Sequence, residues 1–180
     1  MSSYGGKELA DAFRTVRKNT IQVAEDIPES RYGHVAAPEC KSVAGMLAHI
    51  AVSTQIWEEI HKRRRLTTLA GLDYLGMRGR MDADEAKPRS KAEIINWLRT
   101  SGEEFAAWLE TLTSEFLAEM VTERDGKTAK SRFDRLLSAK EHEMHHRAQL
   151  MLIERQLGIV PHITRQFNER VAQAQAAAKA

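Results

Sequence analysis

The 180-residue sequence has little cysteine and no long apolar run. Cys40 is the only cysteine, so an intramolecular disulfide is impossible and nothing points to an oxidising compartment. No run approaches the ~20 apolar residues that cross a bilayer, and the stretch from Met1 to Lys7 lacks the apolar core of a signal peptide. We therefore expect a cytoplasmic protein with no membrane partner.

The net charge is also small, at +2. Domains that bind nucleic acid usually carry a pronounced basic excess, so we expect no nucleic-acid partner. Apolar residues make up 42% of the chain and charged residues 29%, which is ordinary for a globular protein. A chain of this length buries enough surface to fold without a disulfide or a metal ion.

Four long segments show the apolar periodicity of helices, and none shows the sustained alternation of strands. Ser42 and Ser90 are suited to cap helix N-termini, Ser90 and Glu93 have the spacing of a capping box, and Gly158 suits a C-terminal cap. The sequence therefore predicts an all-α fold. Its expected helices span residues 7–27, 42–65, 90–112 and 131–158.

The remaining segments connect or follow these helices. Asp125-Gly126 predicts a small hairpin before the fourth helix. The connection 66–88 is long, which would let the second and third helices run parallel, and it is a candidate for the wall of a pocket. Residues 162–180 predict a weakly packed fifth helix or a frayed tail. We expect a bundle domain over 1–160 and a helical tail over 161–180.

Histidines carry the main functional signal. His142 and His146 lie four residues apart, so on a helix both imidazoles project from one side, as in helical zinc motifs. A third ligand must come from a facing helix, and His49 lies on the apolar stripe of the second one. The spacing alone leaves His145 open as a ligand. It also leaves open that each histidine is a hydrogen-bonded core residue.

Charged residues on the fourth helix suggest which side faces inward. Lys140, Glu143, Arg147 and Glu154 recur at helical spacings, and we expect them to mark the solvent side. The ligand histidines lie off this row and should therefore be buried. Burying a bare imidazole nitrogen costs about 1–3 kcal/mol, so a shared ion is the simplest explanation for several of them.

Other candidates have two readings each. Gln149 and Ser53 lie one turn from a predicted ligand and either line the pocket or pack between helices. Arg147 is expected in a surface ion pair, and Cys40 as a free thiol in a loop. The basic run 61–65 is either a solvated helix cap or a docking patch for an anionic cofactor.

A family resemblance rests on two elements. The stretch His142-Glu143-Met144-His145-His146-Arg147-Ala148-Gln149 resembles the signature of the DinB-like (YfiT-like) family, a His-x-x-x-His followed by Arg-Gly-Gln on the last helix. Met46-Leu47-Ala48-His49-Ile50, with Trp57 downstream, resembles the family's histidine on the second helix. Ala148 replaces the usual glycine. The likeness extends over about residues 7–158.

The resemblance implies a metal-binding four-helix bundle of up-down-down-up type, with the long crossover joining helices two and three. It implies that His49, His142 and His146 hold the metal and that His145 is a neighbour of these ligands. Many members form dimers. Some are transferases or isomerases that use the thiol of bacillithiol, mycothiol or glutathione.

Three neutral histidines leave an open position on a divalent ion, which is typical of catalytic sites. Zinc or nickel is the expected metal, with iron or copper as alternatives. We expect a metal-dependent transferase that uses a low-molecular-weight thiol, or a hydrolase, acting on a small molecule. The alternative is a non-catalytic metal-binding protein with a structural or stress-response role. The apolar stretch with Trp97, Phe105 and Trp108 also suggests a homodimer.

Overall fold

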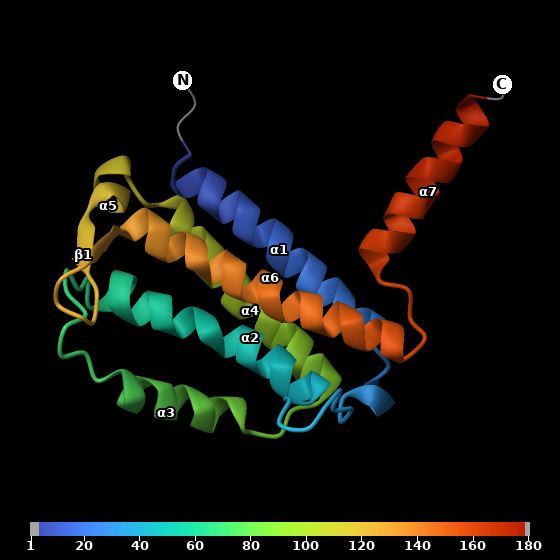
Figure 1. Cartoon of the computed structure of the whole chain (residues 1–180), viewed down its shortest axis with the longest axis horizontal. Helices are drawn as coiled ribbons and strands as arrows, with labels where there is room; N and C mark the ends of the chain where they lie inside the picture. Colours follow the sequence, from blue (N-terminus) through green and yellow to red (C-terminus); the bar gives the residue numbers. More distant parts are fainter. Residues whose placement is uncertain (1–3, 179–180) are drawn as a thin grey trace.

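The computed structural model describes residues 4–178, and four long helices form its core (Figure 1). They are α1 (Gly6–Asp26), α2 (Val43–Trp57), α4 (Lys91–Glu110) and α6 (Arg132–Gln156). Each of α1 and α2 packs against both α4 and α6. In Figure 1, α1 and α6 run in one direction and α2 and α4 in the other. The expected up-down-down-up bundle is confirmed.

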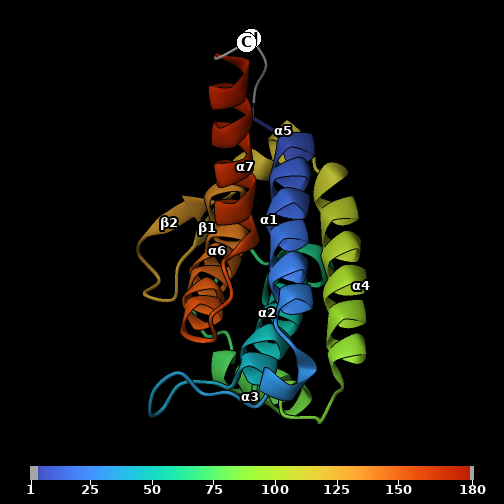
Figure 2. The ribbon, with the colours of Figure 1, turned by 90° about the vertical axis from the view of Figure 1, so that its right-hand side faces the viewer.

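Shorter elements join or extend the bundle (Figure 2). A 3₁₀ turn, η1, follows α1, and a π-helix, η2, continues α2. A small helix, α5, and a two-stranded hairpin lie before α6, and α7 projects away from the bundle (Figure 1). Their bounds are η1 Glu29–Arg31, η2 Glu58–Arg63, α3 Tyr74–Glu85, α5 Ser114–Ala118, β1 Met120–Thr122, β2 Ala129–Ser131 and α7 His162–Ala177. The division at residue 160 stays a prediction, and both ends of the chain lie outside the described residues.

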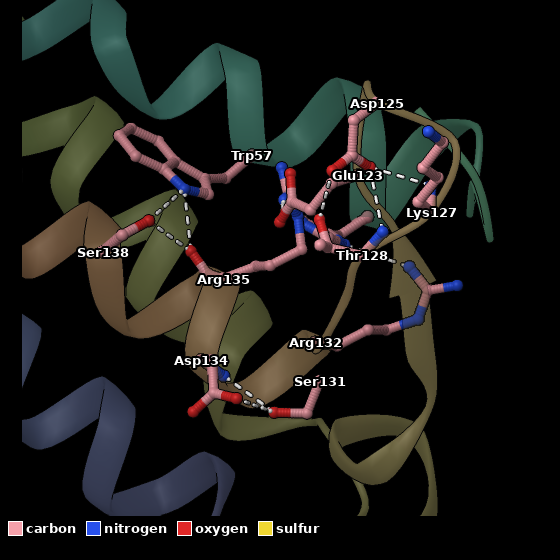
Figure 3. A network of polar contacts seen from close by, with 11 residues as sticks. Trp57, Glu123, Asp125, Lys127, Thr128, Ser131, Arg132, Asp134, Arg135 and Ser138 are labelled. Carbon is pink, nitrogen blue, oxygen red and sulfur yellow. Dashed lines mark hydrogen bonds and ion pairs between the residues drawn. The ribbon is translucent and has the colours of Figure 1, made fainter. Parts of the chain in front are cut away.

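Local sequence signals set the helix ends. Ser42 Oγ accepts a hydrogen bond from Gly45 N at 3.1 Å, and Ser90 and Glu93 form a reciprocal capping box. Ser131 Oγ accepts from Asp134 N at 3.1 Å at the start of α6 (Figure 3). Gly158 has φ of +78°, the left-handed conformation expected of a helix C-terminal glycine.

The hairpin before α6 is also present. Its strands pair antiparallel, with Met120 opposite Ser131. The Asp125 carboxylate accepts from the backbone N–H groups of Lys127 and Thr128 at 2.8 and 2.9 Å, which closes the turn (Figure 3).

The core places large apolar side chains between the helices. Phe13 and Phe105 meet edge to face with ring centroids 4.9 Å apart and are almost fully buried. Trp97 and Trp108 are half-buried, and Arg89 covers the Trp97 ring at 4.0 Å. These residues therefore give no apolar excess that a dimer would have to cover, and the homodimer stays a prediction. No helix within residues 4–178 combines the length and apolarity needed to cross a bilayer.

The expectation that charged residues mark the solvent side of α6 is wrong. Glu143 and Glu154 are 1% and 0% exposed. Glu143 accepts from Arg17 Nε at 2.9 Å in a buried ion pair between α6 and α1. Arg147 is half-buried and donates to Val16 O at 3.4 Å rather than forming a surface ion pair. The positive charge of Arg17, which is distant in sequence, thus stabilises Glu143 at a buried position of α6.

The crossover 66–88 contains a helix that the sequence did not reveal. Helix α3 buries only Met77 and Met81, one turn apart, and its sequence includes Gly76 and Gly79. Two apolar residues make a weak periodic signal, and glycine lowers helix propensity. The helix runs beside α2 (Figure 1).

Candidate metal centre

Three histidines from two antiparallel helices meet in the bundle. His49 comes from the middle of α2, and His142 and His146 come from consecutive turns of α6. One ring nitrogen of each lies within 4.8 Å of one ring nitrogen of the other two. The Nε2 atoms of His49 and His142 are 3.2 Å apart. The ring centroid of His146 lies 4.9 Å from that of His49 and 4.6 Å from that of His142.

A carboxylate from α3 orients the His49 ring. Glu85 Oε2 lies 2.8 Å from His49 Nδ1, and both side chains are more than nine-tenths buried. A carboxylate only accepts hydrogen bonds, so Nδ1 carries the proton and Nε2 presents its lone pair. Lys41 pairs with the other oxygen of Glu85. This arrangement matches the carboxylate–histidine pairs that support metal ligands.

The two histidines of α6 differ in their support. His146 Nδ1 lies 2.8 Å from Gln149 Oε1, so its Nδ1–H donates to the amide oxygen and Nε2 is left available. His142 Nδ1 is buried without a hydrogen-bond partner among the described residues. Trp57 lies edge-on to the His142 ring, with centroids 5.8 Å apart.

The surroundings keep these imidazoles neutral. Burial, reinforced by the neighbouring histidines and Arg78, lowers the pKa of His142 to about 4. Burial also lowers the pKa of His146, against the opposing effect of the hydrogen bond to Gln149. Neutral imidazole is the form that binds metal ions, so the lowered pKa values keep His142 and His146 ready to bind near pH 7.

The spacing of the nitrogens suits one small ion. A tetrahedral ion with metal–nitrogen bonds of about 2.0–2.1 Å holds its ligand nitrogens about 3.3–3.4 Å apart. The 3.2 Å between His49 and His142 is already close to this value. The donors are three neutral nitrogens, the set that zinc, nickel, iron and copper accept.

The other candidates lie around this group rather than in it. His145 is exposed, with its ring centroid 5.0 Å from that of His146. Ser53 is buried, but its hydroxyl donates to Ile50 O within α2. Cys40 is exposed and free, in the loop before α2. The basic run 61–65 is not a simple solvated cap, because His61 at its start is fully buried.

Sequence reasoning missed Glu85 and the Arg17–Glu143 pair. Arg17 had a signal, because it lies one turn from Phe13 on the apolar face of α1 and so required a buried partner. Glu85 had none, since it is one of several acids near the end of α3 and only the fold brings it to His49.

The fold and the converging imidazoles define a helical bundle with a candidate metal-binding centre between α2 and α6. The chain belongs to the DinB superfamily, whose family model matches residues 12–150. The resemblance seen in the sequence is thereby confirmed. A comparison with curated proteins finds no match.

Solved structures show the same fold. YfiT from Bacillus subtilis, described as a probable metal-dependent hydrolase with an unusual four-helix bundle topology, superposes with a TM-score of 0.68 at 17% identity, over 88% of this chain and 91% of YfiT. The DinB-like protein YjoA of Bacillus subtilis gives 0.62 at 21% identity, over 84% of this chain and 92% of YjoA. An uncharacterized protein from Clostridium difficile 630 gives 0.65 at 13%, over 86% of this chain and 98% of that protein.

Proposed function

We propose that His49, His142 and His146 hold one divalent metal ion and that the protein is a metal-dependent hydrolase of a small molecule. The observation that carries the proposal is the convergence of three ring nitrogens, each within 4.8 Å of the others, inside the bundle. Three protein ligands leave coordination positions open, as catalytic sites require. The likeness to YfiT, a probable metal-dependent hydrolase, agrees with this choice.

The chain's own residues prepare the site. Glu85 fixes the tautomer and the ring plane of His49, and Gln149 does the same for His146. Burial keeps His142 uncharged, so no proton has to leave it before an ion enters near pH 7. A divalent ion bound there would lower the pKa of a coordinated water and supply a nucleophile at neutral pH.

A cavity large enough for a small substrate adjoins Glu85, the hydrogen-bond partner of His49, and none of the three histidines is among its lining residues. This cavity of 370 Å³ opens between the N-terminus of α2 and the adjoining ends of α3 and α4, and Glu85 is part of its wall. The cavity falls within the size range of small-molecule sites. Lys41 neutralises Glu85 on this side of His49, so an anionic group of a substrate would meet less repulsion there.

Thiol-dependent transfer is the second candidate. Zinc and its neighbours bind sulfur as well as oxygen, and coordination lowers the pKa of a thiol. The third reading is a metal that only stabilises the bundle. It is less favoured because structural zinc sites usually have four protein ligands, whereas three residues make up this group.

Metal analysis of protein purified without an affinity tag tests the ligand set. We expect about one equivalent of metal in the unaltered protein and a loss in both His49→Ala and His146→Ala. His145→Ala is the matched control, because it removes an exposed imidazole beside His146 and should retain the metal. Retention of the metal in the first two variants would refute the proposed ligands.

Activity assays then separate the three readings. The metal-loaded protein is tested on a panel of ester, amide and phosphate substrates, and separately on an electrophile with glutathione, bacillithiol or mycothiol. Turnover in the absence of thiol supports hydrolysis if it is lost in His146→Ala. Turnover that occurs only when a thiol is added supports transfer. No turnover, together with a sharp fall in the melting temperature on chelation, would favour the structural reading.

A further inference from the structure

A second polar cavity lies at the other end of α2, where the basic run 61–65 meets the loop after α4. Its volume is 410 Å³, and none of the described residues that line it carries a carboxyl group. His61 lies twelve residues beyond His49, which corresponds to roughly 18 Å along a helix, so the cavity is separate from the metal centre. Its lining is formed by His61, Lys62, Arg65, Trp108, Thr111, Leu112, Thr113 and Phe116.

His61 supplies a buried donor that nothing in the described chain uses. Its side chain is fully buried, and its Nδ1 lies 3.0 Å from Arg132 Nη1. A guanidinium only donates, so Nδ1 must accept and the ring proton must sit on Nε2. Nε2 has no hydrogen-bond partner among the described residues. An unpaired buried donor costs about 1–3 kcal/mol, and His61 lines the adjoining cavity, so an acceptor there that reached Nε2 would remove this cost.

Arg132 fixes the His61 ring through the hydrogen bond to Nδ1. It is 1% exposed, and besides His61 it donates to Glu119 Oε2 at 2.7 Å and to Arg65 O at 3.3 Å. Glu119 therefore balances the charge of Arg132. Burial and the positive charge of Arg132 lower the pKa of His61 to about 3, so its ring is a neutral donor across the physiological range.

Two cations stand at the cavity without a strong acidic partner. Arg65 is exposed and forms no ion pair within residues 4–178, and Lys62 reaches Glu58 only at 3.3 Å on the surface. The backbone at Arg65 has φ of +46°, a left-handed conformation that is strained for a side chain of this size. The preceding turn is a π-helix, a form that is frequent at functional sites.

Aromatic and apolar side chains also line the cavity. Trp108 and Leu112 are half-buried and line the cavity together with Phe116. Lys62 Nζ lies 5.8 Å from the centre of the Trp108 ring, so the positive charge and the aromatic surface adjoin. A ligand here would meet cations and an aromatic surface next to each other.

We propose that this cavity binds a small aromatic anion, whose phosphate or carboxylate group accepts from His61 Nε2 and faces Lys62 and Arg65, while its ring lies against Trp108. The site is independent of the proposed metal centre. Phosphate and carboxylate share the chemistry of an anionic acceptor, and the probes below distinguish them.

Calorimetric titration of the full chain with phenyl phosphate, benzoate, inorganic phosphate and phenol tests the proposal. We expect one of the two aromatic anions to bind at least about tenfold more tightly than inorganic phosphate and phenol. Only an aromatic anion can contact both the cations and the aromatic surface of the cavity. The stronger of phenyl phosphate and benzoate identifies the acidic group. Equal affinity for inorganic phosphate would refute the aromatic part, and no binding of either aromatic anion would refute the site.

Charge-matched variants locate the binding. Arg65→Gln and Lys62→Gln should each weaken the tighter probe by about fivefold or more, since each removes a cation at the cavity. Arg64→Gln is the control, because Arg64 is also exposed, carries the same charge and does not line the cavity. His61→Phe should abolish binding, and the two surface variants decide the matter if His61→Phe does not fold. Equal weakening by Arg64→Gln would show non-specific attraction and overturn the proposal.

Discussion

Glu85→Gln tests the metal centre through a residue that need not touch the ion. The substitution keeps the size of the side chain but removes the charge beside His49 Nδ1, which lies 2.8 Å from the carboxylate. A glutamine can offer its oxygen to Nδ1–H, but it is a weaker acceptor. The glutamine –NH₂ group can instead donate to His49 Nδ1. The ring proton would then sit on Nε2, which could no longer bind the metal.

The expected magnitude follows from the burial of the pair. The Glu85 side chain is 9% exposed and that of His49 is 7% exposed, so solvent does little to replace the lost carboxylate. Loss of such an outer partner typically weakens metal binding by about 10- to 100-fold, or roughly 1.4–2.7 kcal/mol. We expect the upper part of this range, because Lys41 also loses its partner and leaves a positive charge near the ion.

Competition with a chromophoric chelator measures the effect for zinc and for nickel. Asp84→Asn is the matched control, because it removes an acid next to Glu85 on the same helix that pairs with Lys87 and Arg89 and does not bond to His49. The control should bind metal like the unaltered protein. If Glu85→Gln binds as tightly as the control while His49→Ala binds nothing, Glu85 does not support the ligand and the reasoning fails.

Three further predictions concern stability in urea. Arg17→Met should destabilise the fold by about 3–5 kcal/mol, because it leaves Glu143 as an unpaired buried charge, and Arg17→Met with Glu143→Leu should recover most of this loss. Burial, with a contribution from Asp26, raises the pKa of Glu154 from 4.5 to about 7, so the folded state binds an extra proton in that window and stability falls as pH rises through it. Glu154→Gln should therefore be more stable than the unaltered protein at pH 8, by about 1–3 kcal/mol, and lose this advantage near pH 5; a constant difference would contradict it. Ser90→Ala should cost about 1 kcal/mol through the lost cap, and an unchanged unfolding midpoint would contradict this.

The helices were predictable because their signals are local. A cap such as Ser42 and a C-terminal glycine such as Gly158 act within a few residues of chain, and their geometry is present in the structure. The pairing of His142 with His146 is local as well, since it follows from one helical turn. His49 was a candidate because it lies on the apolar stripe of another helix, and the family pattern strengthened that choice, since no spacing rule links residues on different helices.

The errors arose where the burial of a residue depends on the packing of the whole fold, which the local sequence does not show. Glu143 and Glu154 were interpreted as solvent-facing because acids usually are, yet both lie in the interior. The partner of Glu143 lies 126 positions away. Helix α3 was missed for the opposite reason, since it is largely exposed and leaves little apolar pattern to detect.

The buried pair of Arg17 and Glu143 also bears on how the metal centre forms. Successive residues of a helix point about 100° apart, so the rotation of α6 that brings Glu143 to α1 turns His142 toward α2. Arg17 holds that rotation with two contacts to Glu143, at 2.9 and 3.0 Å, and is itself anchored to Leu98 O on α4 at 2.7 Å. An apolar pair at these positions would pack as well but would tolerate small rotations of α6. The ion pair therefore adds little net stability relative to such a pair, and its two contacts fix the direction in which the two histidines of α6 meet His49.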